Sequence, residues 1–290
     1  MKGSCRVTHR IASKDTVVDC DYRPAHTALQ SIIAGYYSIK NPHLLSGRVI
    51  TGLCKCALFL HIFHDDREME LSFGKTTTTS TYQGILGGQI TGPTMIYCKE
   101  PINVISIEVL PVGLKQLFGI SALELKEQIV SLRDIHFSDF DRLIDKLRHQ
   151  ISIEEYKKTL DEFFLRHFLY NDKIDSFRTC IDPLFRSSGT ITVGELQKKS
   201  GLSKRQFERR FKEQAGISAS TLRRFIRSSS ALNRILHDDS VFNVVEALGY
   251  VDQSHLIKDI KWYTGKTPNL LHENYRNRVF HIGSATYILE

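Results

Sequence analysis

The sequence predicts an α+β protein: an N-terminal β-barrel with following helices, then an all-α domain with two helix-turn-helix units. Short apolar runs separated by turn signals fill the first 110 residues, and helical spacing begins near Pro111. Two helix-turn-helix patterns then follow one another toward the C-terminus. A length of 290 residues suits two domains better than one. We divide the chain into a β domain at 1–120, a helical linker or dimerisation region at 121–175, a helix-turn-helix domain at 176–280 and a tail at 281–290.

The composition is that of an ordinary globular protein, with 41% hydrophobic and 24% charged residues. No apolar run reaches the roughly 18 residues that a membrane span needs. The first residues, MKGSCRVTHR, lack the apolar core of a signal peptide. The six cysteines are scattered along the chain, which fits reduced thiols better than a disulfide framework. We therefore expect a cytoplasmic protein with no membrane segment.

The positive charge is concentrated in the C-terminal part. Residues 177–278 hold 18 Lys and Arg against 10 Asp and Glu, a net charge of +8. The rest of the chain holds 21 against 22, a net charge of −1. This distribution fits a near-neutral sensing or scaffolding part joined to a part that binds a polyanion, although an unevenly charged surface would look the same.

The N-terminal part reads as short strands. Its apolar runs are 48–50, 56–63 and 104–109, and the Thr76 to Thr81 tract favours extended backbone or a loop. Turn signals separate these runs at Asn41-Pro42, Ser46-Gly47, Gly87-Gly88 and Gly92-Pro93. Many short strands with frequent turns indicate a sandwich or a small barrel.

Helical spacing begins at Leu114, Leu117 and Phe118 and continues through 121–170, and 172–187 reads as a further helix. One stripe has the spacing of a single helix face: Leu160, Phe163, Phe164, His167 and Phe168. Such a stripe fits either intramolecular core or a seam between two copies. We expect a homodimer, with the helix around 155–170 as its candidate seam.

The first helix-turn-helix unit runs from Thr192 to Gln214, with Gly201 in the turn and Ser203 as the expected N-cap of the second helix. Two aromatic residues of that helix, Phe207 and Phe211, lie on one face. The opposite face carries Arg205, Glu208, Arg209 and Lys212. A helix fixed by two aromatic residues with cations outward has the layout needed to enter the major groove of double-stranded DNA, although a solvated amphipathic helix is the plain alternative.

The second unit runs from Val241 to Thr264, with Gly249-Tyr250-Val251 as its turn. Its second helix has an inward face made by Leu256, Ile260 and Tyr263. The residues expected to face DNA are Gln253, Ser254, Ile257, Lys258 and Lys261.

One helix is expected between the units, from Ser220 to His237. At ~1.5 Å a residue it spans roughly 28 Å. Successive major grooves on one face of DNA lie ~34 Å apart. A rigid spacer of that length lets one monomer place two helices in adjacent grooves.

Residues 180–278 resemble the DNA-binding domain of the AraC/XylS regulators. The stretches GLSKRQFERRFKEQAGISASTLRRFIR and LGYVDQSHLIKDIKWYTGKTPNLL carry the resemblance, which covers about a third of the chain. It implies a sequence-specific DNA-binding transcription regulator of bacterial type, with RNA polymerase as a further partner and no enzymatic activity. It also implies that bases are read by Arg205, Glu208, Arg209, Gln253, Ser254, Ile257 and Lys258.

The sequence departs from this family's pattern at three positions. Gln197 and Val245 stand where the family prefers a small alanine, and Ile260 stands where phenylalanine is usual. In addition, Glu208 places a carboxylate at a DNA-facing position, where it accepts from cytosine N4 or repels phosphate. These departures bear on the strength of DNA binding and not on the fold.

GGQITGP at 87–93 and IEVLPVGLKQLFGIS at 107–121 resemble the cupin-like N-terminal domain attached to some AraC-type regulators. That resemblance implies a β-barrel that binds a small-molecule effector, with no effector-binding residue to name. No cofactor is expected.

Cupin enzymes hold a metal ion, so a metal-dependent enzyme is one alternative function. The candidate ligands are His61, His64, Asp65, Asp66 and Glu68. In a strand the two histidines point to opposite faces, which argues against a shared site. Cys54 and Cys56 share a strand face and fit either a thiol sensor or two buried hydrophobes. The other alternative is an interaction protein whose degenerate domain no longer reads DNA.

Overall fold

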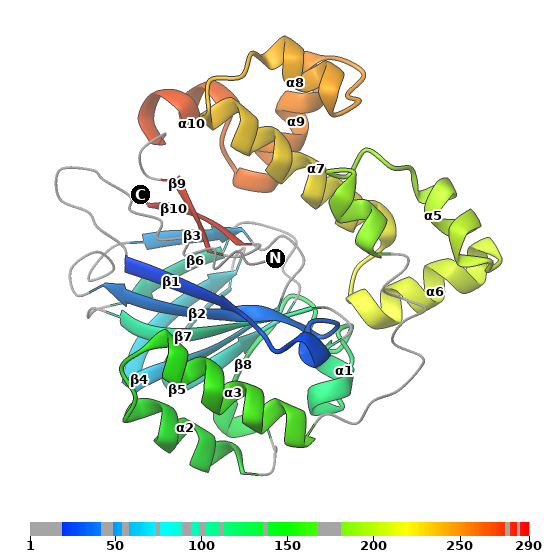
Figure 1. Ribbon diagram of the computed structural model, residues 1–290. Helices are drawn as coiled ribbons and strands as arrows, with labels where there is room; N and C mark the ends of the chain where they lie inside the picture. The colour runs from blue at the N-terminus through cyan, green and yellow to red at the C-terminus, as the bar shows by residue number, and fades with distance from the viewer. Residues whose placement is uncertain are drawn as a thin grey trace.

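The computed structural model describes residues 19–41, 49–53, 58–73, 76–88, 94–98, 102–110, 113–135, 139–167, 181–275, 279–282 and 285–289. A β domain with covering helices forms the N-terminal part, and a helical domain follows it (Figure 1). Cys54, Cys56, Phe168, and most of the GGQITGP motif lie outside the described residues.

The β domain consists of antiparallel strands. They are β1 (Asp19–Pro24), β2 (Ile33–Asn41), β3 (Val49–Leu53), β4 (Leu58–Phe73), β5 (Thr76–Gly87), β6 (Thr94–Cys98), β7 (Ile102–Val109), β8 (Ile129–Ser131), β9 (Val279–Ile282) and β10 (Ala285–Leu289). The strands pair in the order β1-β2-β7-β4-β6-β3-β10-β9, and β5 pairs with β4 and β8. Because the described strands leave β1 and β9 at the two ends of this path, an antiparallel sheet is established here and a closed barrel is not.

The helices of the N-terminal part follow the strands. They are η1 (Thr27–Leu29), α1 (Gly113–Phe118), η2 (Leu132–Asp134), α2 (Phe140–Arg148) and α3 (Ile153–His167). α3 contacts η1, β1 and β2, and α2 contacts β4, so the two helices cover the sheet (Figure 1).

β8 corrects the expectation of continuous helix from 121 to 170. Ile129-Val130-Ser131 has β-branched residues that favour extended backbone, and it pairs with residues 85–87 of β5. A three-residue strand has too little periodicity to be read from sequence.

The helical domain contains α5 (Val193–Ser200), α6 (Lys204–Ala215), α7 (Ala219–Leu236), α8 (Val241–Ala247), α9 (Gln253–Thr264) and α10 (Pro268–Tyr275). Residues 181–186 are also helical, which agrees with part of the helix expected at 172–187.

The chain then returns to the β domain. The sequence predicts a tail at 281–290, but residues 285–289 form β10, which pairs with β3 and with β9. The sequence does carry a signal for this hairpin, because VFHI and ATYIL are short β-prone runs on either side of a Gly-Ser pair. The helical domain is therefore followed, as well as preceded, by strands of one sheet (Figure 1).

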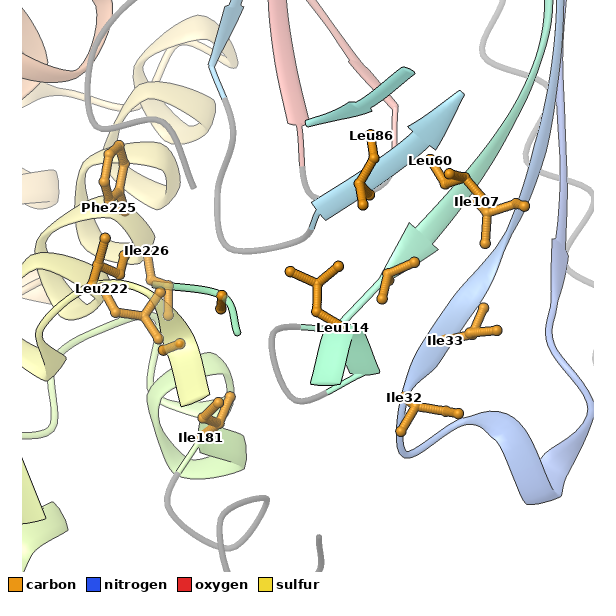
Figure 2. Close-up of a cluster of buried hydrophobic side chains, with 14 of the residues drawn as sticks. Ile32, Ile33, Leu60, Leu86, Ile107, Leu114, Ile181, Leu222, Phe225 and Ile226 are labelled. Atoms are coloured by element: carbon orange, nitrogen blue, oxygen red, sulfur yellow. The ribbon is translucent and has the colours of Figure 1, made fainter. Parts of the chain in front are cut away.

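Buried apolar side chains form one cluster that extends from the sheet into the helical domain. Figure 2 shows Leu60 and Ile107 of the sheet on one side, Leu222 and Phe225 of α7 on the other, and Leu114 of α1 between them in this view. None of the described helices combines the length and apolar character needed to cross a bilayer.

Candidate nucleic-acid interface

In the first helix-turn-helix unit, local residues fix where α5 begins and where it ends. Thr192 caps α5, and its hydroxyl accepts from the Glu195 backbone N–H at 3.2 Å. In return the Thr192 N–H donates to the Glu195 carboxylate at 2.8 Å, and this bond is the largest cause that lowers the pKa of Glu195. Gly201 ends the helix with φ +67°, a conformation that costs glycine little. The polar residues around the turn therefore specify it locally.

α6 presents the predicted reading face to solvent. Ser203 caps it and forms a reciprocal capping box with Gln206, which confirms the expected N-cap. Phe207 and Phe211 are buried with ring centroids 5.6 Å apart. On the opposite side lie the exposed residues Arg205, Glu208, Arg209 and Lys212. Only Arg209 of these has an ion pair in the described structure, a 3.8 Å contact with Glu213 one turn later.

α9 has the same arrangement in the second unit. Asp252 caps it and accepts from the His255 backbone N–H at 2.7 Å. Leu256, Ile260 and Tyr263 are buried, as their spacing predicts. The opposite side holds the exposed residues Gln253, Ser254, Ile257, Lys258 and Lys261. Both predicted faces are therefore exposed to solvent, as entry of a helix into a DNA groove requires.

α7 is the expected connecting helix, which begins and ends one residue earlier than predicted, and it contacts α5, α6, α8, α9 and α10. Its 18 residues span about 27 Å at ~1.5 Å each. Ser218 caps its start and accepts from the Thr221 N–H at 3.1 Å. One continuous helix thus touches both units.

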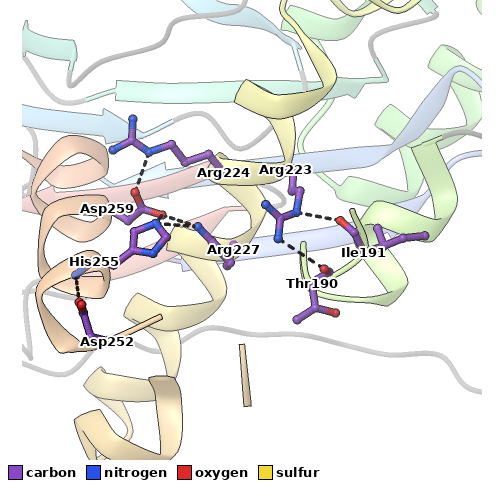
Figure 3. A network of polar contacts seen from close by, with 8 residues as sticks. All are labelled: Thr190, Ile191, Arg223, Arg224, Arg227, Asp252, His255 and Asp259. Atoms are coloured by element: carbon purple, nitrogen blue, oxygen red, sulfur yellow. Dashed lines mark hydrogen bonds and ion pairs between the residues drawn. The ribbon is translucent and has the colours of Figure 1, made fainter. Parts of the chain in front are cut away.

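Three arginines of α7 make contacts that the sequence reasoning did not foresee (Figure 3). Arg223 donates to the backbone carbonyls of Ile191, at 2.7 Å, and Thr190, at 3.4 Å, just before α5. Arg224 and Arg227 instead donate to the carboxylate of Asp259 on α9.

The electrostatics of this network reflect its burial. Desolvation lowers the pKa of Arg223, and repulsion from Arg227 adds to that effect. Burial likewise raises the pKa of Tyr250 to about 12, with the Asp259 carboxylate as the next cause. A usable signal existed in the sequence, because position 259 falls on the inward stripe of α9, where an aspartate needs a buried partner.

The departures from the family pattern have structural explanations. The Gln197 side-chain amide donates to the Leu202 carbonyl and so closes the turn of the first unit. Val245 is half-buried against the core, and its carbonyl accepts from the Tyr250 N–H at 2.9 Å. Ile260 is fully buried, so an aliphatic side chain fills the position where an aromatic is usual.

The candidate metal ligands all lie in β4. The His64 ring nitrogen contacts the Tyr156 hydroxyl at 2.9 Å, and Asp66 pairs with Arg133 and Arg148, each at 2.7 Å. These side chains thus attach α2, α3 and η2 to the sheet. Among the residues with described positions, no group of three or more His, Cys, Asp or Glu could hold a metal ion.

One family model matches the chain. Its description is helix-turn-helix domain, and it covers residues 196–274, from α5 into α10. No curated protein matches the sequence.

Several solved structures resemble the chain at low identity. ToxT from Vibrio cholerae is 13% identical with a TM-score of 0.40, over 88% of this chain and 97% of that one. A ToxT structure from Vibrio cholerae strain SCE256 with an unsaturated fatty acid bound is 11% identical with a TM-score of 0.44, over 90% and 98%. The AraC-like transcriptional activator CuxR is 11% identical with a TM-score of 0.25, over 79% and 91%.

Proposed function

Residues 196–274 are a helix-turn-helix domain of the AraC type, and on that premise we propose that the chain is a cytoplasmic, sequence-specific DNA-binding transcription regulator. The observation that carries the proposal is the pair of helices α6 and α9. Each buries one face and exposes the side chains predicted to read DNA. The charge of +8 on residues 177–278 supports it, because DNA binding is driven largely by phosphate contacts.

Binding of the full chain to a library of genomic DNA fragments tests the proposal. We expect a selected set of duplexes whose affinity falls steeply between about 50 and 200 mM salt, since counterions are released on binding. The variant Arg205→Ala/Arg209→Ala/Lys212→Ala should lose both affinity and sequence preference.

A matched control removes the same charge from exposed residues of α2 and α3: Arg142→Ala/Lys146→Ala/Lys158→Ala. It should bind the selected duplexes nearly as well as the wild type. Equal losses in both variants would mean that charge alone attracts DNA. A wild-type chain that binds no duplex would identify an interaction protein with a degenerate domain.

Control by a small-molecule effector is a further part of the proposal. It is supported by a contact between the N-terminal part and the end of the reading helix α6, where the Ser121 hydroxyl donates to the Glu213 carbonyl at 3.2 Å. A ligand that displaces this segment would act directly on α6. Mapping of bound genomic sites with and without host metabolite extract tests it, and identical maps would argue against an effector.

Homodimer formation and contact with RNA polymerase complete the proposal, and sedimentation of the full chain measures the first. No catalytic step is assigned to the protein. Stoichiometric Fe, Mn or Zn in the purified chain would instead favour a cupin-type metal-dependent enzyme.

A further inference from the structure

Asp259 is a carboxylate on the inward face of a reading helix. It is 2% exposed and lies between Leu256 and Ile260, which are fully buried. An ionised carboxylate in such surroundings is costly unless both oxygens are bound. Its position therefore demands partners from the element packed against it.

Both partners come from α7 (Figure 3). Arg224 Nε lies 2.7 Å from Asp259 Oδ1, and Arg227 Nη2 lies 2.9 Å from Oδ2. His255, one turn earlier on α9, places its Nε2 3.3 Å from Arg227 Nη2. Since each carboxylate oxygen has a separate arginine, rotation or sliding of α9 would break at least one of these contacts.

Aromatic rings hold the two guanidinium groups in place. The Arg227 guanidinium carbon lies 4.1 Å from the ring centre of Tyr250, in the turn between α8 and α9. The corresponding carbon of Arg224 lies 4.0 Å from the ring of Trp262, near the end of α9. Stacking of this kind orients a guanidinium plane, so α7 grips α9 before and after Asp259.

The same helix holds the first unit through the neighbouring arginine. Arg223 donates to the carbonyls of Ile191 and Thr190, which lead into α5. Both units are thus held by α7, the first through Arg223 and the second through Arg224 and Arg227. Because α7 holds both units, it sets the rotation of α9 about its own axis relative to the first unit. This rotation decides the direction in which Gln253 and Lys258 point.

We propose that the Arg227–Asp259 pair, assisted by Arg224, is a positioning device that fixes the phase of α9 relative to α6, so that the spacing between two half-sites becomes a determinant of specificity. This inference rests on the proposed function. Neither residue reads bases itself. Both decide which side chains of α9 meet the groove and where along the duplex they meet it.

The test uses the full chain and its best selected duplex, with the segment between the half-sites lengthened or shortened by one or two base pairs. One added base pair shifts and rotates the second half-site, so the wild type should lose about tenfold in affinity, comparable to a mismatched base pair. Asp259→Asn should keep the base preference at the first half-site. Its affinities for the different spacings should differ by less than about threefold, because the lost contact accounts for most of the tenfold difference expected of the wild type.

Two further variants separate positioning from folding. Arg227→Met/Asp259→Leu removes the charges but keeps the volume buried, so it should fold and still show relaxed spacing. Asp239→Asn is the matched control, because Asp239 pairs with Arg234 of α7 at 2.6 Å but belongs to no reading helix. It should retain the wild-type spacing preference.

The inference is overturned if Asp259→Asn and the double variant lower affinity equally on every spacing, or not at all. The pair would then contribute packing alone. A wild type that selects no duplex overturns the proposed function itself, and this outcome is visible before any variant is made.

Discussion

Asp66 and Asp259 each bind two arginines, but water reaches only one of them. The Asp66 side chain is 40% exposed where it joins β4 to η2 and α2, whereas the Asp259 side chain is 3% exposed between α7 and α9. Exposed ion pairs are screened and contribute little, while a buried carboxylate deprived of its partner is strongly destabilising. The contacts of Asp66 therefore make a small contribution to stability, whereas those of Asp259 hold α9 in one orientation against α7.

Asp66→Asn should produce a pH-dependent loss of stability. The hydrogen bond from Arg148 is the largest cause that lowers the pKa of Asp66. A carboxyl whose pKa is lowered by folding stabilises the protein above its unfolded pKa, and that contribution disappears as the pH falls through the folded pKa. We expect a cost of about 1 kcal/mol in the free energy of unfolding at pH 7, discounted for exposure.

Urea unfolding at several pH values measures this difference. It should shrink toward zero at acid pH, below the ordinary pKa of aspartate. Asp145→Asn on the exposed side of α2 serves as the control and should change little. A difference for Asp66→Asn that stays constant down to acid pH would contradict the ion-pair explanation.

Arg209 and Lys261 should differ in how their loss affects DNA binding. A guanidinium fork suits guanine O6 and N7, so Arg209→Ala should cost about 1–3 kcal/mol on the best site and relax preference at one base pair. We expect Lys261 to contact phosphate, so Lys261→Ala should weaken binding to all sequences about equally. Binding-site selection with each variant decides the matter. An unchanged consensus for Arg209→Ala would make that residue a phosphate contact.

At the scale of elements, α3 shows how an apolar stripe is used. The sequence left open whether Leu160 and Phe164 form core or a dimer seam. Both are fully buried against the sheet, and Asp161 beside them accepts from the Tyr36 hydroxyl and the His26 N–H, each at 2.8 Å. The stripe is therefore core, and its expected use as a dimer seam is corrected: the outward face of α3 is mostly charged.

Phe164→Ala should accordingly lower the free energy of unfolding by about 3–5 kcal/mol, as large core truncations do. Leu165→Ala, on the exposed side of the same helix, is the matched control and should change it by about 0.5 kcal/mol. Chemical unfolding measures both, and sedimentation of the two variants should give the wild-type mass. A stable Phe164→Ala protein of reduced mass would instead make the stripe an interface between copies.

The two helices predicted to read DNA, α6 and α9, could be located from sequence because the signals for a helix-turn-helix are local. Ser203 as a cap, Gly201 in the turn and the Phe207/Phe211 pair all lie within ten residues of one another. The pairing of Asp259 with Arg227 and of β10 with β3 depends on residues distant in the chain. Such pairs follow from packing, which spacing along one element does not reveal.

At the scale of the whole molecule, the end of α6 lies against residues 121–122, which follow α1 in the N-terminal part. Gly216 ends the helix with φ +73°, and a Cβ there would lie 2.5 Å from the Ala122 carbonyl oxygen. Gly201 has nearly the same conformation, φ +67°, with open space around it. The two glycines thus offer the same backbone strain with and without a neighbour.

Gly201→Ala should cost about 1–2 kcal/mol, the strain of a left-handed alanine. Gly216→Ala should cost clearly more, because segment 121–127 must also move. Thermal unfolding compares the two, and DNA affinity shows whether the displaced segment alters α6. Equal costs would mean that the segment yields freely and does not couple the β domain to α6.

The return of the chain into the sheet adds a second anchorage for the helical domain. β9 begins at Val279, shortly after α10 ends at Tyr275, and β10 joins the edge of β3. A rigid body held at two separate points keeps one principal freedom, which is rotation about the line that joins them. We therefore expect a displacement of the β domain to tilt α6 and α9 together, by the same angle, about this axis.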